Sequence, residues 1–267
     1  PPGWPVWPAA MRYADLYAKD PEAGLEAAWL GHRLIAHELK AVGVNGDFSP
    51  VLDVPADGAD PIIGDRAFGP DAQTVTLLAG AALQGLREGG VVGCIKHIPG
   101  HGRADVDSHL ALPQVGEGMN ALAADMAPFR ALKQAEAAMT AHIVYAALDP
   151  ERPATQSPTV IAYLREDIGF DGLLISDDLD MKALCGTLRE KAEGALKAGC
   201  DLVIQCSGVV AEMAETAEGV GLLAGRSLER AFAAEAVAKA DAEDFDAAEA
   251  WWRFRRLMGQ GYGLKTA

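Results

Sequence analysis

The stretch VVGCIKHIPGHGRADVDSH, residues 91–109, runs from an apolar segment directly into a loop crowded with ionisable side chains. The first part, residues 91–97, predicts a buried strand because β-branched and apolar residues follow one another without alternation. Pro99, Gly100 and Gly102 exclude a helix after this strand and predict a tight loop. Histidines, aspartates, a lysine and an arginine therefore gather where a buried strand ends.

Four further apolar runs end in polar residues in the same way, namely 46–54, 137–145, 172–179 and 201–206. Amphipathic helical patterns separate the runs, at 25–39, at 75–86 before Gly89-Gly90, at 122–129, and at 180–198 before Gly199. Strands that alternate with helices predict an α/β protein with a parallel sheet. Ionisable residues at the carboxyl ends of the strands predict the active site of a (β/α)8 TIM-type barrel or of an open doubly wound sheet. No strand is followed by G-x-G-x-x-G, which argues against dinucleotide binding.

The chain after Cys206 is rich in Ala and Glu and is expected to be helical to its end. Trp251, Phe254 and Met258 form an apolar face on this part, which we expect to pack on the barrel. We therefore predict a single (β/α) barrel catalytic domain over residues 1–267, in which residues 207–267 are a helical C-terminal part.

Composition excludes several classes of partner. The 267 residues carry a net charge of −15, which argues against binding to nucleic acids or anionic membranes. No apolar run approaches the roughly 18 residues of a membrane span, and the start PPGWPVWPAA contains no recognisable secretory signal. The four cysteines lack C-x-x-C spacing and are expected to be reduced, buried thiols of a cytoplasmic protein.

Two pairs of residues carry candidate chemistry. Asp177 and Asp178 follow the run at 172–176, and because neighbours in a strand point to opposite faces, only one of them is expected to face a barrel mouth. That one is a candidate nucleophile or metal ligand, whereas a pair that only caps the next helix is the simpler alternative. Asp107 and His109 share a side if the segment is extended, so the carboxylate can orient an imidazole acting as general acid/base. A turn cap is the simpler alternative for this pair.

A metal site is a third possibility. His97 and His101 are spaced as i and i+4, which suits metal ligands on a helix, but Pro99 and Gly100 break the helix that this spacing needs. A metal-dependent (β/α) hydrolase would use these two histidines together with Asp107, His109 and Asp177.

Taken together, these segments resemble one family. KHIPGHG followed by DSH, with FSPVLD (48–53) upstream and SDDL (176–179) downstream, is the pattern of bacterial β-N-acetylglucosaminidases of glycoside hydrolase family 3, the NagZ type. The resemblance extends from the first ten residues to about Cys206. It includes IIGDRAFG (62–69), MTAHIVY (139–145) and LREDIGFDG (164–172).

The resemblance implies a β-N-acetylhexosaminidase that removes non-reducing terminal β-N-acetylglucosamine from a saccharide, in peptidoglycan (muropeptide) recycling or from chitin-like fragments, without a cofactor or metal. It implies a role for seven residues: Asp177 as nucleophile, His109 as acid/base with Asp107 as its dyad partner, Lys96, His97 and Arg66 as sugar-binding residues, and Asp53 as a supporting residue. Retention needs a nucleophile and a proton donor on opposite sides of the anomeric carbon. A histidine suits the second role because its ordinary pKa of about 6.5 lies near neutral pH.

The resemblance covers only part of the family's barrel. The five strands match the fourth to the eighth, and about 70 residues with the first three strands precede the matching region in the family. Five parallel strands cannot close an eight-stranded barrel, so an open edge is expected on each side. An inactive or sugar-binding remnant of the fold is therefore an alternative to the enzyme. The sequence leaves open whether water or phosphate receives the glycosyl group, and whether the protein is a monomer or a homodimer.

Overall fold

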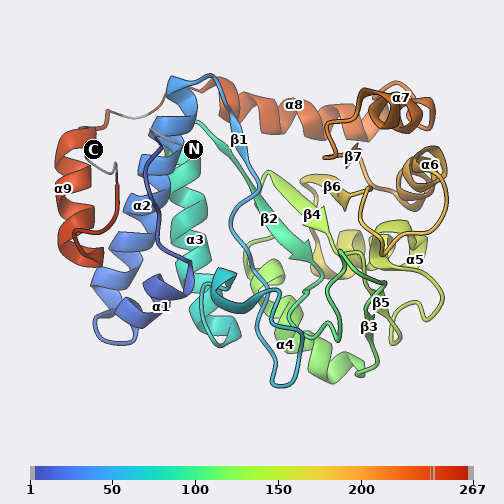
Figure 1. The fold of residues 1–267 in the computed structure, drawn as a ribbon, viewed down its shortest axis with the longest axis horizontal. Coiled ribbons are helices and arrows are strands. Elements are labelled where there is room, and N and C mark those ends of the chain that lie inside the picture. Colours follow the sequence, from blue (N-terminus) through green and yellow to red (C-terminus); the bar gives the residue numbers. More distant parts are fainter. Residues whose placement is uncertain (1–3, 241, 243, 264–267) are drawn as a thin grey trace.

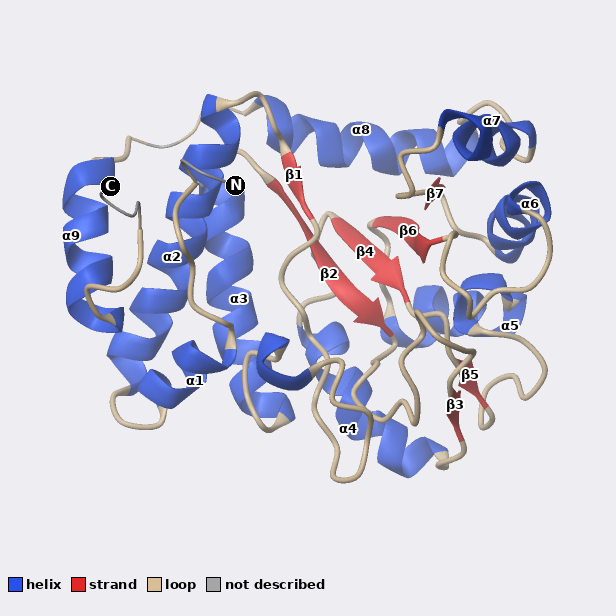
Figure 2. Cartoon of the chain, viewed as in Figure 1, coloured by secondary structure: helices blue, strands red, loops and turns tan. Residues whose placement is uncertain are grey.

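The computed structural model describes residues 4–240, 242 and 244–263, which form an α/β fold with a curled parallel sheet (Figures 1 and 2). The strands of this sheet are β1 (Gly46–Asp47), β2 (Val92–Ile98), β4 (Ala137–Thr140), β6 (Leu173–Asp178) and β7 (Leu202–Ile204). Their order is β1-β2-β4-β6-β7, and each neighbouring pair is parallel. Within the described residues β1 and β7 are the two edges of the sheet. The predicted partial (β/α) barrel of five strands is confirmed.

Several of the expected strands are shorter than predicted, and β7 keeps only Leu202–Ile204 of the run at 201–206. The run at 46–54 is regular only in β1, because Pro50 has no N–H to donate; the chain nevertheless stays beside β2, where the Leu52 N–H donates to the Lys96 carbonyl. The run at 137–145 divides into β4 and β5 (Val144–Tyr145). Strand β5 pairs with β3 (Gln114–Val115) in a separate two-stranded sheet that the sequence did not predict.

The helices cover the outer face of the sheet and one end of it (Figure 1). They are α1 (Met11–Tyr17), α2 (Pro21–Ala41), α3 (Ala72–Glu88), α4 (Met119–Ala131), α5 (Pro158–Tyr163), α6 (Leu188–Ala198), α7 (Val210–Glu218), α8 (Gly225–Lys239) and α9 (Ala247–Met258). Short 3₁₀ segments at Gly64–Arg66 and Ala154–Gln156 and a π-helical turn at Leu164–Ile168 complete the regular structure. The predicted helices at 25–39, 75–86 and 122–129 correspond to α2, α3 and α4.

The helix predicted over 180–198 begins eight residues later than expected. Thr187 is the N-cap of α6 and forms a capping box with Glu190, which fixes the start of the helix at Leu188. The chain from Leu179 to Thr187 is instead an irregular loop that follows β6. A loop, and not the start of a helix, therefore follows the carboxyl end of the strand that carries Asp177 and Asp178.

Alternation along the strands divides the core into two parts. Ile95 of β2 and Leu174 of β6 point outward and pack with the covering helices in the main core. Cys94 and Ile175 point to the concave side, where they form a second cluster with Ala234 of α8. Helix α8 crosses the sheet at the ends where the strands begin (Figure 1) and contacts β2 and β6 there, so the opposite, carboxyl ends of the strands are left to the loops.

The cysteines are reduced, but only two are buried. Cys94 and Cys200 lie in the core, whereas Cys185 and Cys206 are exposed on loops that follow β6 and β7. The prediction of four buried thiols is therefore wrong for these two. No helix in the described part of the chain is both long and apolar enough to cross a membrane.

Helix α9 packs against α2 through an aromatic cluster. Phe254 is fully buried and lies edge-on to Trp7, Trp251 and Tyr262, while Trp7 and Trp251 stack with ring centroids 4.9 Å apart. The predicted anchoring face of residues 251–258 thus contacts the N-terminal segment and α2 (Figure 1). Residues 1–3, 241, 243 and 264–267 of the predicted domain lie outside the described residues, and the single-domain organisation stays a prediction.

Substitution at this cluster tests that organisation. We expect Phe254→Ala to lower the free energy of unfolding by about 3–5 kcal/mol, because it leaves a cavity between α9 and α2. Trp252→Ala, on the exposed side of the same helix, is the matched control and should change it by no more than about 0.5 kcal/mol. Urea denaturation followed by both tryptophan fluorescence and circular dichroism measures the effect. Two separate transitions in the wild-type protein would contradict a single domain.

Candidate active site

A cavity of about 220 Å³ lies at the carboxyl ends of β2, β4 and β6. Five residues that the sequence predicted for the site line this cavity: Arg66, Lys96, His97, His109 and Asp177. They come from the segment after β1, the end of β2, the loop after β2 and the end of β6. The parallel sheet therefore brings together residues that lie far apart in the sequence, as expected for a barrel.

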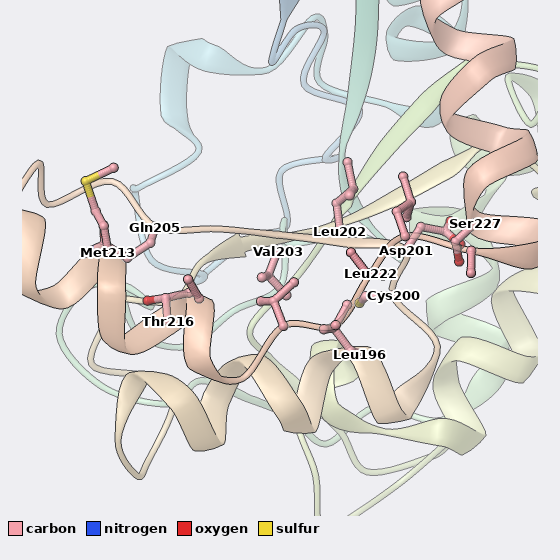
Figure 3. Close-up of a pocket in the computed structure, with 15 residues that line it drawn as sticks. Leu196, Cys200, Asp201, Leu202, Val203, Gln205, Met213, Thr216, Leu222 and Ser227 are labelled. Carbon is pink, nitrogen blue, oxygen red and sulfur yellow. The ribbon is translucent and has the colours of Figure 1, made fainter.

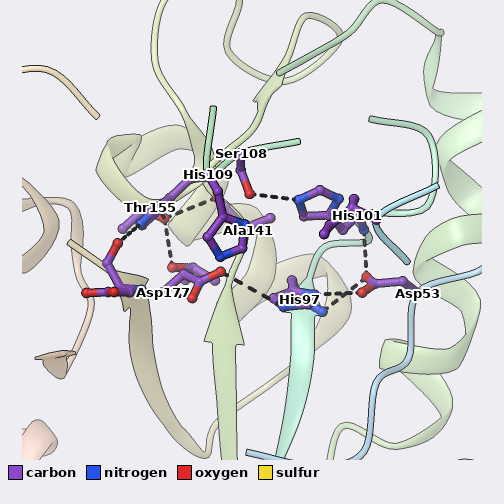
Figure 4. A network of polar contacts seen from close by, with 12 residues as sticks. Asp53, His97, His101, Ser108, His109, Ala141, Thr155 and Asp177 are labelled. Atoms are coloured by element: carbon purple, nitrogen blue, oxygen red, sulfur yellow. Dashed lines mark hydrogen bonds and ion pairs between the residues drawn. The ribbon is translucent and has the colours of Figure 1, made fainter. Parts of the chain in front are cut away.

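Asp53 lies behind the cavity and holds two residues that line it, His97 and His101. This fully buried carboxylate accepts hydrogen bonds from His97 Nδ1 at 2.6 Å, from the His97 N–H at 3.1 Å and from the His101 N–H at 2.6 Å (Figure 4). Burial by itself raises the pKa of Asp53, but the charge and hydrogen bonds of His97, together with the hydrogen bond from the His101 N–H, outweigh burial and lower it. Because Asp53 holds Nδ1, the other ring nitrogen of His97 faces Asp177, with Nε2 3.9 Å from Oδ2.

The two neighbouring aspartates of β6 have different surroundings. Both line the cavity. Asp178 Oδ1 accepts hydrogen bonds from the Asp180 and Cys206 N–H groups, so it holds the turn after β6 and joins that turn to the end of β7. Asp177 Oδ1 accepts only a short-range bond from the Asp178 N–H, and its Oδ2 lies toward His97. Asp177 is therefore the carboxylate of the pair that is positioned for chemistry.

Asp107 and His109 form the predicted contact, although not in an extended segment. Asp107 Oδ1 accepts hydrogen bonds from His109 Nδ1 at 2.7 Å and from the His109 N–H at 2.9 Å, which is a turn closed by the aspartate side chain. These two bonds, together with burial that opposes them, leave the pKa of Asp107 below its ordinary value. Because Nδ1 is held by Asp107, Nε2 is the ring atom of His109 that is left for a ligand in the cavity.

Lys96 and Arg66 supply positive charge to the cavity wall. Burial, and then the nearby Arg66, lower the pKa of Lys96, while Asp177 and Asp47 oppose that shift. Lys96 and His97 are neighbours in β2, and neighbours in a regular strand point to opposite faces. Both nevertheless line the cavity, at the point where the β2–β4 ladder shifts its register. Arg66 is held over the cavity by a hydrogen bond from Nη1 to the Ile62 carbonyl.

Several residues of the site lie in the quoted motifs but were given no role in the predicted reaction. Phe48, Ser108 and Met139 line the cavity, and so does His101, which the sequence singled out only as a possible metal ligand. His142 is fully buried behind the site, with Nδ1 2.7 Å from Thr155 Oγ1 and Nε2 3.0 Å from the Asp178 carbonyl.

The predicted metal alternative receives no geometric support. Among residues 4–240, 242 and 244–263, no group of three His, Cys, Asp or Glu side chains is arranged to hold a metal ion. His97 and His101, two of the three histidines of that hypothesis, are instead joined through Asp53, and their ring centroids lie 5.3 Å apart.

A larger cavity of about 530 Å³ lies beside β7, between α6, α7 and the start of α8 (Figure 3). Its walls are mostly apolar, with Leu196, Val203 and Leu222 among them. The carboxylate of Asp201 at its edge is paired with Arg165 at 2.7 Å and with Arg230 at 3.1 Å, so it supports the fold and is not free for chemistry. The smaller, polar cavity is therefore the candidate active site.

A comparison with known protein families identifies the family of the chain. The profile of the Glycosyl hydrolase family 3 N terminal domain matches residues 6–235. The chain belongs to glycosyl hydrolase family 3. The matched region contains every strand of the sheet and all seven predicted site residues.

Curated relatives within family 3 include beta-hexosaminidases. That of Neisseria meningitidis serogroup C (strain 053442) is 40% identical over 211 residues, which are 77% of this chain and 58% of the relative. That of Methylococcus capsulatus is 40% identical over 210 residues, which are 77% of this chain and 62% of the relative. The chain thus spans about three fifths of the length of these relatives.

Solved structures of family 3 members share the fold. NagZ from Neisseria gonorrhoeae in complex with N-trifluoroacetyl-D-glucosamine superposes with a TM-score of 0.83 at 34% identity, covering 96% of this chain and 77% of that one. The β-N-acetylglucosaminidase from Paenibacillus sp. str. FPU-7 superposes with a TM-score of 0.77 at 30% identity, covering 87% and 50%. The predicted family resemblance is confirmed.

The buried carboxylate of this family 3 site gives a prediction for stability against pH. The pKa of Asp53 lies below 3.8 in the folded state, so its ionised form stabilises the fold above about pH 5, and this contribution is lost as the pH falls through the folded value. We expect Asp53→Asn to be less stable at pH 7 by roughly 1–3 kcal/mol.

The difference between the two proteins should shrink below about pH 4, by at most about 1.4 kcal/mol per pH unit. Urea unfolding of both proteins measures this difference in the free energy of unfolding. The series runs up to pH 7 from about pH 3, or from the lowest pH at which both proteins still fold. A difference that stays constant over the series would mean that Asp53 is not held ionised by the two histidines.

Proposed function

We propose that this chain carries the catalytic site of a retaining glycoside hydrolase that removes non-reducing terminal β-linked N-acetylglucosamine. The observation that carries the proposal is the joint presence of an Asp107–His109 dyad and of Asp177 at one cavity, on two different strand ends. Retaining hydrolysis needs such a pair, one group as nucleophile and one as acid and base. The relatives named beta-hexosaminidase, and the family 3 structure solved with N-trifluoroacetyl-D-glucosamine, support the substrate class.

In the first step Asp177 attacks the anomeric carbon of the sugar while His109 Nε2 gives its proton to the departing glycosidic oxygen. The bond from the anomeric carbon to that oxygen breaks, and a glycosyl ester forms on Asp177. Asp107 stabilises the protonated imidazole before the transfer and keeps the ring oriented. In the second step water loses a proton to His109 and attacks the anomeric carbon, which releases the sugar and restores both side chains.

The remaining predicted residues hold the sugar. Lys96, His97 and Arg66 present donors to the cavity, and each is suited to the hydroxyl groups of a saccharide. Asp53 acts one step removed, because it fixes the ring of His97 against Asp177. We assign the natural substrate to cell-wall muropeptides or chitin-like fragments, the two sources that the family resemblance implies.

One feature favours a second candidate function. The sheet leaves β1 and β7 as unpaired edges in the described residues, so its five strands do not close a barrel around the cavity. A site that binds N-acetylglucosamine without cleaving it would fit these facts. Calorimetric titration with the sugar, run beside a turnover assay, separates the two functions: binding without turnover supports the second.

The cellular setting is part of the proposal. We place the protein in the cytoplasm, since all four cysteines are free thiols and two of them are exposed. Its assembly state stays the predicted monomer or homodimer.

Substitution of the two acting groups tests the mechanism. We expect Asp177→Asn and His109→Ala to lower kcat/KM for an aryl N-acetylglucosaminide by at least about 10³-fold and 10²-fold respectively, because each removes a group that reacts. Asp180→Asn is the matched control, because this exposed aspartate follows Asp177 closely in the chain but does not line the cavity. It should retain wild-type turnover, and an equal loss in all three variants would contradict the assignment.

Chemical trapping identifies the nucleophile directly. A 2-fluoro sugar with an activated leaving group should form a long-lived ester, because the fluorine slows both steps whereas the activated leaving group speeds only the first. Peptide mass spectrometry should find the added mass on the peptide that contains Asp177. The same mass on a peptide without this residue would move the nucleophile elsewhere.

A further inference from the structure

The loop that carries the proposed acid/base shows an alternation of exposure that its catalytic roles do not explain. The side chains of Asp107 and His109 are 21% and 61% exposed, whereas Ser108 between them is 2% exposed. A serine that is buried at the tip of a polar surface loop must have partners that replace water. Those partners show what holds the loop in place.

Ser108 contacts two other parts of the site. Its Oγ lies 3.2 Å from His101 Nε2, and its carbonyl accepts a hydrogen bond from the Ala183 N–H at 3.2 Å (Figure 4). Ala183 belongs to the loop of residues 179–187, which follows the strand that carries Asp177. The part of the loop that carries the acid/base is therefore fastened both to the start of the same loop, at His101, and to the loop after β6, at Ala183.

His101 is itself fixed from below. Its N–H donates to Asp53, the same carboxylate that holds His97 against Asp177, and its ring is 97% buried in the wall of the cavity. A neutral imidazole carries one N–H. It belongs on Nε2, where Ser108 Oγ accepts it, because Nδ1 has no hydrogen-bond partner within the described part of the chain. Burial, which lowers the pKa of His101, keeps the ring in this neutral, donating form.

We propose that His101 and Ser108 are positioning residues that hold the acid/base loop over the cavity and couple it through Asp53 to His97. The coupling runs from Asp177 to His97, Asp53, His101 and Ser108, and ends beside His109. This role deepens the proposed function and rests on it, since it concerns the residue that would deliver the proton. General acid catalysis needs the donor within hydrogen-bond reach of the leaving oxygen, so a loosened loop weakens proton delivery before it weakens sugar binding.

Three variants isolate the contact. Ser108→Ala removes only the hydroxyl, His101→Phe removes both ring nitrogens but keeps a buried ring, and His101→Gln restores an N–H donor of similar reach. His37→Phe is the matched control, because His37 is exposed on α2, away from the cavity. All four full-length proteins are compared with the wild type.

The first measurement is hydrogen–deuterium exchange of the peptide that spans residues 105–113. We expect exchange to become at least about tenfold faster in Ser108→Ala and His101→Phe, with His101→Gln nearer the wild type, while peptides of β2 and β6 keep their protection. This measurement needs no turnover, so it decides the positioning role even if the proposed hydrolysis fails. Unchanged exchange in both variants would overturn the proposal.

The second measurement compares leaving groups. Dinitrophenolate leaves the sugar without being protonated, whereas phenolate needs a proton from the acid. Ser108→Ala and His101→Phe should therefore lose at least about tenfold more kcat/KM on the phenyl glycoside than on the dinitrophenyl glycoside. His101→Gln should recover part of that loss. Equal losses on the two substrates would overturn the positioning role, because they would place the two residues in sugar binding or in the general fold.

Discussion

The buried carboxylate of Asp53 is the interaction on which the rest of the site depends. One side chain, inaccessible to water, accepts three hydrogen bonds, two from His97 at the end of β2 and one from His101 in the loop that follows. An ionised carboxylate is costly to bury unless such partners surround it, and a loop rich in glycine and proline holds no fixed shape without an anchor. The hydrogen bonds to Asp53 meet both needs. They hold the loop after β2 in one shape, and they stabilise the buried charge of Asp53.

The close approach of the backbone in this region follows from the same constraint. A side chain at Gly102 would place its first carbon 1.8 Å from the Val54 carbonyl, so only glycine lets the loop lie against the segment that carries Asp53. The Gly102 carbonyl accepts a hydrogen bond from the Ala56 N–H, which adds a backbone link between the two segments. The glycines of this motif therefore serve packing, and the histidines serve the cavity.

The sheet and the loops divide the work of the site. Lys96, His97 and Asp177 sit on strand ends, where backbone pairing holds them rigidly. His109 sits on a loop that only side-chain and single backbone contacts secure, among them those of Ser108. This division suits a reaction with two steps, in which the nucleophile stays fixed while the proton donor and acceptor must serve a departing sugar and then an entering water.

The sequence by itself determined that five parallel strands end in ionisable residues at one edge of the sheet, because apolar runs with such ends fit few other folds. It also determined the family, because the joint motif is specific. It also determined the Asp107–His109 contact, since two residues so close in the chain meet in a turn as readily as in a strand. It could not place the start of α6, where one capping box overrode the helical pattern of residues 180–187. Only the tertiary structure decided that Asp53 binds both His97 and His101, that Ser108 is buried between the half-buried Asp107 and the exposed His109, and that Asp178 holds a turn while Asp177 faces His97. Most of these contacts join residues far apart in the chain, 28 residues for Asp178 and Cys206 and 48 for Asp53 and His101. Their geometry arises when strand ends converge, which no local pattern of residues records.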